Sequence, residues 1–372
     1  MELKIKRIRT YEELDSIKPI WEEFQNAKNG PSVFQSWTWN RTWCDEVLRF
    51  QKHAALDVRV AEESNGKIVA ILPTYIDKRT IPGISTLQFL AHRMSIYNDL
   101  LLCEPENQEL ALAVAESLMD SLGPATIVHL RHLGEESTFT KALLLKNWAQ
   151  IQCPRLLLRN DPSITDQSKR LGQARRKAFR SAHNRLVKEY SIEYRVVKWQ
   201  DFSPAMSELI ELHLRRFDAK GQSSLLQGQT LPFLQRAMQD STNRNLFEIV
   251  QLRANDTTVA AVLMVKDRKS YVYFQGGFEP DFSRFSPMRL LLTETIRRGF
   301  DDLGFEVYDL GDGYGTYKCD WSPTASMNYF CCRGNNPLYA NVFAAVTRYA
   351  FQRKTLGRLS REVLELTGIQ LH

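Results

Sequence analysis

The sequence predicts an α+β fold, with mixed sheets of the α/β type, built as two related domains in tandem and joined by a basic helix. A hairpin followed by a strand, a helix and a strand occurs once in each half of the chain. Between the halves, residues 169–188 hold eight Lys or Arg and no acid. At 372 residues, the chain is also too long for one ordinary core. We therefore expect domains at 1–165 and 166–372, the second opening with a linker helix over 168–189.

The first half alternates helical and strand-like patterns. Asn65-Gly66 separates two alternating runs, and this dipeptide is a strong hairpin signal. The expected elements are a strand at Leu3–Ile8, a helix at Glu12–Ala27, an aromatic-rich helix at 36–50, hairpin strands at 56–63 and 67–76, a strand at 99–102, a helix at 107–121 and a strand at 126–133.

The second half repeats this order. Ala254-Asn255-Asp256 separates two strand-like runs, and a third, YVYFQGGF, is rich in the aromatic and β-branched residues that suit strands. The expected elements are strands at 246–253, 258–266 and 271–278, a helix at 287–303, a strand at 306–310 and a last strand near 327–332. In that last strand, Cys331 and Cys332 should alternate, one buried and one outward.

Two basic amphipathic helices are expected. The linker helix has apolar residues near a 3.6 period, and a second helix begins at Asn341 and weakens at Gly357. Either domain acids or a polyanion should compensate the linker's charge; a structural strap and a ligand-binding surface both remain open. Its apolar positions are Leu171, Ala174, Ala178, Ala182, Leu186 and Val187.

Composition excludes several classes. The 43% hydrophobic and 25% charged fractions are typical of globular proteins. No apolar run approaches the ~18 residues of a spanning helix, and the N-terminus lacks a secretory pattern. We expect a cytoplasmic protein, with a peripheral position at the inner membrane left open. The net charge of +6 is local, so DNA is not an expected partner. The six cysteines lack zinc spacing, so we expect reduced structural thiols and no metal.

The segment from Tyr271 to Trp321 carries the most chemical information. Ser286 and Pro287 are preferred N-cap and first-turn residues, so a helix should begin there. Helix N-termini bind phosphates, and Arg289 in the first turn is unfavourable by roughly 0.3–1 kcal/mol unless an anion docks. Arg284 lies beside it in the sequence. The alternative is a pair of solvated surface arginines.

Here the sequence resembles the GNAT acyltransferases, and more closely the CelD-like group of polysaccharide gene clusters, itself related to the Fem-type peptidoglycan ligases. The resemblance implies tandem GNAT-like domains, with an acyl-CoA donor held by the second. The segments that carry it are 34–39, 95–102, 175–194, 212–224, 274–292 and 308–321. It implies donor contacts from Gln275, Arg284, Ser286, Pro287, Met288, Arg289 and Leu290. The CelD-like group commonly has glycine at the position of Met288. The methionine leaves less room for a pyrophosphate, so an occluded or repurposed donor site is an alternative.

Acyl transfer needs a base, an oxyanion stabiliser and an acid. The glycine-rich exit of the strand at 306–310 offers all three. Asp309 or Asp312 is a candidate base, Lys318 a stabiliser, and Tyr314 or Tyr317 an acid. Tyr317-Lys318 matches a Tyr/Phe-Lys pattern of the CelD-like and Fem-type groups. The alternative is a turn that closes the sheet, with Lys318 solvated.

Weaker candidates lie elsewhere. Tyr97 and Asp99 match a Tyr-x-Asp pattern of the family and are candidates for the acceptor cleft; a strand-entry turn is equally consistent. Trp39 could stack on a sugar, although aromatic residues at helical spacing are more often core. Arg215 and Arg216 are candidates for phosphate contacts or solvated helix-end charges.

The sequence thus predicts an acyltransferase that moves an acyl group from CoA to an amine or hydroxyl of a sugar or polysaccharide precursor. The expected acyl group is acetyl. One alternative is a Fem-type ligase that uses aminoacyl-tRNA. Another is an inactive scaffold in a membrane-associated polysaccharide-export assembly.

Overall fold

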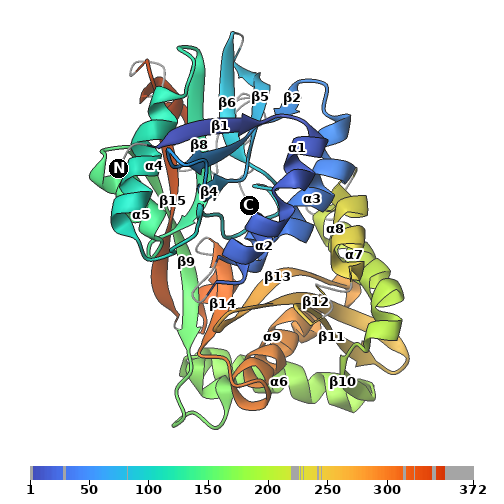
Figure 1. The fold of residues 1–372 in the computed structure, drawn as a ribbon. Coiled ribbons are helices and arrows are strands. Elements are labelled where there is room, and N and C mark those ends of the chain that lie inside the picture. Colours follow the sequence, from blue (N-terminus) through green and yellow to red (C-terminus); the bar gives the residue numbers. More distant parts are fainter. Residues whose placement is uncertain are drawn as a thin grey trace. The chain divides into compact units, whose positions relative to one another are not determined.

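A computed structural model describes residues 3–27, 31–81, 83–218, 226, 228, 230–240, 243, 245–312, 316–321, 323–336 and 341–347 (Figure 1). The chain forms two compact units. Unit 1 comprises Met1–Cys153 and Met327–His372, and unit 2 comprises Pro154–Ser326. The sequence analysis placed everything after residue 165 in one domain. The division differs because the strand that contains Met327 pairs with a strand of unit 1.

The described residues of unit 1 form two groups of strands and several helices. One sheet has the order β1-β3-β4-β7, and the other strands have the order β15-β8-β6-β5-β2. The strands are β1 (Lys4–Ile8), β2 (Ala54–Leu56), β3 (Val58–Glu62), β4 (Ile68–Leu72), β5 (Thr74–Ile81), β6 (Ile84–Phe89), β7 (Leu101–Leu102), β8 (Thr126–Gly134) and β15 (Thr324–Gly334). The helices are α1 (Tyr11–Ser16), α2 (Lys18–Gln25), α3 (Trp37–Glu46), α4 (Gln108–Asp120) and α5 (Thr138–Leu145).

The Asn65-Gly66 hairpin is confirmed, since β3 and β4 pair antiparallel and Gly66 has a φ of +82°. Two expected elements are divided instead. Proline has no N–H to continue a ladder, and Pro73 separates β4 from β5, which pair in different strand groups. The helix expected at Glu12–Ala27 breaks at Ile17, just before Pro19 in the first turn of α2.

The sequence predicts one buried and one outward cysteine at 331 and 332, but hydrophobic packing buries both. Cys331 and Cys332 are both buried, at 0% and 4% exposure. Cys331 packs in the main core of unit 1, whereas Cys332 packs against Phe343 and Ala344 in the helical residues 341–347. The expected outward cysteine is therefore covered, because both faces of β15 carry packed elements. The rest of the second basic helix, from residue 348, lies outside the described residues.

Unit 2 has the strand order β10-β11-β12-β13-β14-β9. All neighbouring strands pair antiparallel except β13 and β14, which are parallel. The strands are β9 (Ala149–Arg159), β10 (Ile192–Val196), β11 (Phe247–Ala254), β12 (Thr257–Asp267), β13 (Ser270–Phe278) and β14 (Val307–Asp312). The helices are α6 (Gln173–Glu189), α7 (Phe202–Asp218), α8 (Thr230–Gln239), α9 (Pro287–Arg297) and α10 (Thr316–Cys319). The N-terminal end of β9 and the C-terminal end of β15 belong to unit 1.

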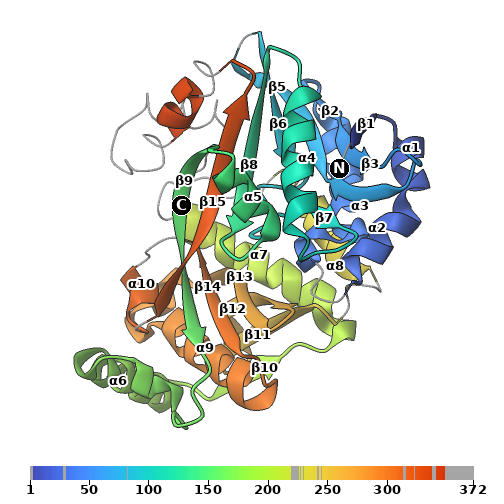
Figure 2. The ribbon, with the colours of Figure 1, turned by 60° about the vertical axis from the view of Figure 1, so that its left-hand side comes forward.

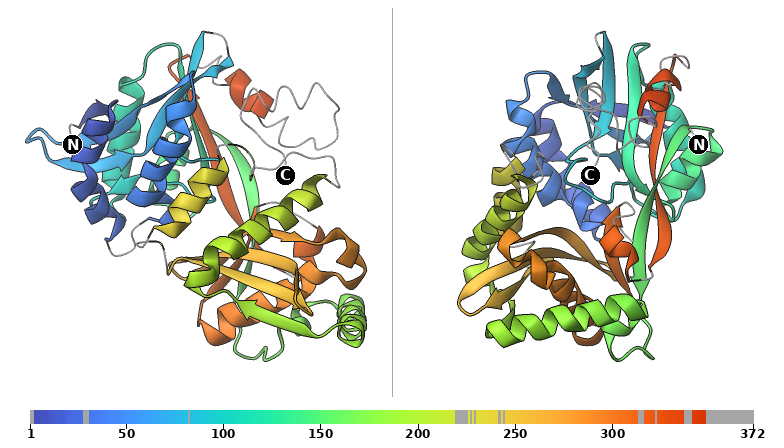
Figure 3. Two further views of the ribbon diagram at one scale, coloured as in Figure 1. Left: turned by 90° about the vertical axis from the view of Figure 1, so that its right-hand side faces the viewer. Right: turned by 180° about the vertical axis from the view of Figure 1, so that it is seen from behind.

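Two adjacent glycines of β13 show how α7 and α9 cover the sheet (Figure 3). A Cβ on Gly277 would lie 2.3 Å from the backbone nitrogen of His213 in α7. A Cβ on Gly276 would lie 3.1 Å from Cε of Met288 in α9. Because successive residues of a strand point to opposite faces, α7 and α9 lie on opposite faces of the sheet.

An ionic cluster anchors the far end of α9. Arg298, in the π-helical turn Arg298–Asp302, donates two hydrogen bonds of 2.7 Å to Glu248 on β11. Tyr271 donates to the same carboxylate at 2.5 Å, and Lys266 lies 3.0 Å from it. Burial alone would raise the pKa of Glu248, but these donors outweigh it and lower that pKa to about 2. The cluster therefore stays charged at any ordinary pH and holds the end of α9 on the sheet.

The expected basic helix is present as α6 (Figure 2), although it lies within unit 2, which begins at Pro154. Its apolar stripe is narrower than predicted. Ala182 and Leu186 are buried, and Phe179 packs beside them on the core of unit 2. Ala174, Ala178 and Val187 are exposed instead. Of the eight cations in 169–188, only Arg175 forms an ion pair with a carboxylate of the described residues. Most of the positive charge on α6 is therefore uncompensated by that part of the protein.

The close approach of α7 to β13 leads to a stability prediction. Gly277→Ala should lower the free energy of unfolding by roughly 1–3 kcal/mol, because its methyl group would meet the backbone of α7 rather than a side chain that can move. Urea denaturation measures this change. Gly134→Ala is the matched control, since a Cβ there meets nothing within 4 Å. Equal stabilities of the two variants would contradict the proposed contact.

Candidate active site

The parallel pair β13 and β14 separates part of the way along. Ser270, Tyr271 and Val272 pair with Val307, Tyr308 and Asp309, and the described ladder ends there. β13 nevertheless continues to Phe278. A bulge at Phe274 accompanies the change, because the register with β12 shifts between Leu263 and Met264. β13 therefore extends beyond its last described residue pair with β14.

β14 bends where it leaves its neighbour. Its register with β9 shifts between Asp309 and Asp312, and Gly311 has a φ of +77°. Positive φ favours glycine, so Gly311 suits this turn. A Cβ on Gly311 would lie 3.7 Å from the carbonyl oxygen of Tyr273 and 3.7 Å from Nζ of Lys318. Lys318, on α10, is therefore placed at the point where the two parallel strands part.

Asp309 does not fit the role of a base that was predicted for it. The side chain is fully buried and forms an ion pair with Arg155 on β9. Its Oδ1 also accepts a hydrogen bond of 2.8 Å from the N–H of Gly311. A carboxylate held by a buried guanidinium is typical of a structural anchor, because protonating it would break a buried ion pair. The other predicted catalytic side chains, those of Asp312, Tyr314 and Tyr317, lie outside the described residues.

The N-terminus of α9 lies after β13, as predicted, with Pro287 at the first helical position. Ser286 occupies the N-cap position, but its φ is +52° and its side chain caps nothing. The backbone N–H groups of Arg289 and Leu290 instead reach the Ser286 carbonyl, at 3.0 and 3.2 Å. Ser286 therefore contributes its backbone conformation to the turn, and its hydroxyl group forms no hydrogen bond that caps the helix.

The predicted donor-binding arginines have protein partners. Arg284 donates to Glu189 at 2.6 Å, and its guanidinium lies 4.5 Å from the ring centre of Phe285. Arg289 donates to Asp320 at 2.6 Å. The argument that Arg289 requires a bound anion is therefore wrong as stated, because a carboxylate already supplies the negative charge. Met288 is buried against Gly276, and Gln275 is half-buried on β13.

α7 places two further predicted residues near the end of β13. Arg215 pairs with Glu211 and Glu279, both at 2.5 Å. Arg216 lies over the ring of Phe278 at 5.4 Å. The buried His213, which the sequence analysis did not single out, shares a 3.0 Å hydrogen bond with the carbonyl of Gly276. These contacts fix α7 on β13 beside the separated part of the strand.

In unit 1, the predicted acceptor residues have mainly structural contacts. Trp39 is fully buried and donates to Ser95 at 3.1 Å, so its ring has no face open to a sugar. Asp99 accepts from Ser137 at 2.7 Å and from the N–H of Leu100 at 2.8 Å, which is typical of a turn. Tyr97 is half-buried, with its ring 6.4 Å from that of Phe34. Tyr97 and Asp99 are both partly exposed, whereas Trp39 is not.

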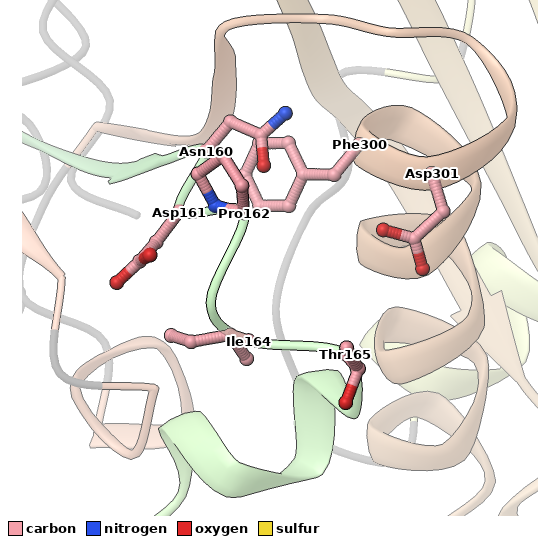
Figure 4. Close-up of a pocket in the computed structure, with 7 residues that line it drawn as sticks. All are labelled: Asn160, Asp161, Pro162, Ile164, Thr165, Phe300 and Asp301. Atoms are coloured by element: carbon pink, nitrogen blue, oxygen red, sulfur yellow. The ribbon is translucent and has the colours of Figure 1, made fainter.

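A separate depression of about 390 Å³ lies in unit 2 (Figure 4). It is formed by the loop after β9 and the π-helical turn after α9, and none of the predicted site residues lines it. The lining residues are Asn160, Asp161, Pro162, Ile164, Thr165, Phe300 and Asp301. Asp301 is 14 residues beyond the start of α9, about 20 Å along the helix. The depression is thus distinct from the candidate site.

The described residues meet the requirements of neither a metal site nor a membrane-spanning helix. No group of three or more His, Cys, Asp or Glu among them is placed to hold a metal ion. Within the same residues, no helix is both long and apolar enough to cross a membrane.

The buried ion pair leads to a prediction that separates a structural role for Asp309 from a catalytic one. Asp309→Asn should destabilise the protein by roughly 3–5 kcal/mol, because it removes one charge of a buried ion pair. Chemical denaturation measures the change. Glu306→Gln, which removes an exposed partner of Lys269, is the control and should cost less than about 1 kcal/mol. An Asp309→Asn variant of unchanged stability would restore the residue as a catalytic candidate.

Comparisons with known proteins agree with this geometry. Residues 173–319 match the family model described as "Acetyltransferase (GNAT) domain". A search of curated protein sequences finds no match. Among solved structures, FemX is similar over 92% of this chain and all of its own, with 11% identity and a TM-score of 0.56. L-PGS from Bacillus licheniformis is similar over 88% of this chain and 95% of its own, with 11% identity and a TM-score of 0.52.

A conserved protein of unknown function from Bacteroides thetaiotaomicron is similar over 89% of this chain and 100% of its own, with 11% identity and a TM-score of 0.52. At these identities the structures show the fold alone. Together with the family model, they show a GNAT fold for residues 173–319, which span α6 to α10 of unit 2.

Proposed function

We propose that the protein is an acyl-CoA-dependent acyltransferase whose donor binds unit 2 between β13 and β14, with its phosphates at the N-terminus of α9. The observation that carries this proposal is the early end of the parallel ladder at Val272 and Asp309. Beyond it, β13 continues to Phe278 while β14 turns at Gly311, and an extended, amide-containing ligand can lie where the two strands part. CoA has such an arm, ending in a pyrophosphate.

A comparison of the two units explains why the donor is assigned to unit 2. In unit 1, β6 and β8 also form a parallel pair of three residues each, connected through α4. There, Asn107 caps α4 through its side chain, at 2.9 Å from the N–H of Leu110, and Glu109 adds an acid to the first turn. α9 has neither a side-chain cap nor an acid in its first turn. An anion is therefore favoured at α9 and disfavoured at α4.

Met288 does not argue against this assignment. Its side chain is buried and packs against Gly276 on the sheet. The methionine thus fills space under the helix, and its backbone remains part of the first turn. Arg289 and Arg284 contribute positive charge near the same end even though each has a carboxylate partner.

The chemistry assigned to the site is nucleophilic acyl substitution. The acceptor amine or hydroxyl attacks the thioester carbonyl carbon, the new C–N or C–O bond forms, and the C–S bond breaks. The acceptor loses a proton, and CoA leaves as the thiol. Lys318 is placed where the strands part and is the group that we assign to the developing oxyanion. Asp312 is the remaining carboxylate candidate for the base, with Tyr314 or Tyr317 as the acid.

For the acceptor, we propose a sugar or polysaccharide precursor and acetyl as the acyl group. Support comes from the sequence resemblance to the CelD-like group, carried by segments such as 274–292 and 308–321. Tyr97 and Asp99 of unit 1 are the candidate acceptor contacts that are partly exposed. A position at the inner face of the membrane, beside the machinery that uses such precursors, fits the same proposal.

A Fem-type ligase is the second candidate, and two observations favour it. The fold is similar to that of FemX along most of both chains. In addition, α6 exposes several cations that no described carboxylate pairs, including Lys177, Arg180 and Lys188. Such a surface suits the phosphates of aminoacyl-tRNA. The third reading, an inactive scaffold, predicts that neither donor binds.

Donor dependence is the decisive experiment. The purified protein should release free thiol from acetyl-CoA when given amino-sugar acceptors, and saturating acetyl-CoA should raise its melting temperature. Ligand at 100 times its Kd contributes about 2.7 kcal/mol of stability. Transfer from charged tRNA that ribonuclease abolishes would establish the second candidate instead. Absence of binding by either donor would leave the scaffold.

Lys318→Ala should lower turnover at least about 100-fold, because one preorganised oxyanion donor is lost. The side chain is only half-buried, so the fold should survive, which thermal melting checks. Steady-state kinetics with acetyl-CoA measure the effect. A folded variant with near-normal turnover would remove Lys318 from the mechanism.

A further inference from the structure

Asp320 lies between two arginines that come from different helices. Its Oδ2 accepts a 2.6 Å hydrogen bond from Arg289 in the first turn of α9. Its Oδ1 lies 3.1 Å from Nε of Arg175 in α6. The Asp320 side chain is 9% exposed and that of Arg289 21%, whereas Arg175 is 59% exposed. The pair with Arg289 is the more protected from solvent, so it is the stronger of the two.

This contact holds the short helix that carries Lys318. α10 has four residues, too few to be stable on its own. Asp320 follows it directly, and Trp321 is next, 1% exposed in the core of unit 2. The N–H of Trp321 reaches the Lys318 carbonyl at 3.3 Å. The C-terminal end of α10 is therefore fixed by two successive side chains, one ionic and one apolar.

The start of α9 and Lys318 on α10 both lie at the candidate site. α9 begins where the donor phosphates are placed, and Lys318 Nζ lies beside Gly311, where β14 leaves β13. The Asp320–Arg289 pair is the described polar contact that links these two features. A shift of α10 by about 1 Å would displace the Lys318 ammonium from the reacting carbonyl, and misplacements of that size cost up to about 100-fold in rate.

We propose that Asp320 is a positioning residue, which with Arg289 sets the place of Lys318 for acyl transfer. Arg289 then acts through Asp320 and not as a direct ligand of the donor. This inference rests on the proposed function for its kinetic consequence, but the placement of Lys318 is a property of the protein that can be measured without any donor.

The experiment compares Asp320→Asn, Asp320→Glu and Asp302→Asn. Asp302 is a matched control, since this aspartate also lies between two arginines, Arg297 at 2.7 Å and Arg298 at 3.8 Å, beyond the other end of α9. The first readout is the rate at which trace acetic anhydride labels the Lys318 amine, followed by peptide mass spectrometry, with Lys269 as the internal reference. The second is kcat and KM for acetyl-CoA.

Asp320→Asn should change the relative labelling rate of Lys318 at least about threefold and lower kcat about tenfold or more, with the acetyl-CoA KM nearly constant. Asp320→Glu keeps the charge and should recover part of both effects. Asp302→Asn should match the wild type in both readouts.

Three results would overturn the inference. One is unchanged labelling of Lys318 in a folded Asp320→Asn variant. Another is a raised acetyl-CoA KM with constant kcat, which would make Arg289 a donor ligand. The third is equal effects of Asp320→Asn and Asp302→Asn. Should Asp320→Asn fail to fold, Asp320→Glu and Arg289→Lys decide by the same labelling. If the wild type does not use acetyl-CoA, the proposed function fails, while the labelling still tests the placement of Lys318.

Discussion

The buried pair of Asp309 and Arg155 is the interaction on which the geometry of the candidate site depends. It holds β14 against β9 at Asp309, which is the last residue of β14 in the described ladder with β13. The same carboxylate accepts the N–H of Gly311 and so fixes the turn in β14. Without this anchor, β14 could continue alongside β13 past Val272. The pair thus explains how a parallel ladder that ends early persists in a packed core.

Much of the fold could be predicted from local patterns. The hairpins at Asn65-Gly66 and at Asn255, the strand that contains Gln275 and the helix that begins at Pro287 follow from turn residues and periodicity, and each is confirmed. The division of β4 from β5 at Pro73 could also have been read from the sequence, because proline interrupts a ladder. β6 and β9 were not predicted, and each pairs with a strand far away in the chain, β8 and β14 respectively, although β6 also pairs with the adjacent β5. Their places depend on tertiary pairing, which no local pattern contains.

The site illustrates the same limit for charges. The sequence shows that Arg284 and Arg289 flank a helix start, but their partners, Glu189 and Asp320, are 95 and 31 residues away. A cation at a helix N-terminus needs an anion, and the sequence cannot show whether the protein or a ligand supplies it. The ion pair of Asp309 is hidden from the sequence for a related reason, since Arg155 is 154 residues distant. Residue types predicted the kind of chemistry, whereas long-range ion pairs decided which side chains remain able to perform it.

The two units differ at one corresponding position of their parallel strand pairs. Both units contain a short parallel pair, a helix between its strands, and a non-ladder residue of positive φ in the second strand, His132 in β8 and Gly311 in β14. In unit 1 the bulge is filled, since Arg131 lies over the Phe330 ring and Asn98 donates to the Arg131 carbonyl. In unit 2 the corresponding place holds a glycine and the Lys318 ammonium. Packed side chains therefore fill this position in unit 1, whereas in unit 2 a glycine and the ammonium group of Lys318 lie there. Such divergence between two copies of one fold is what separate roles for the units require.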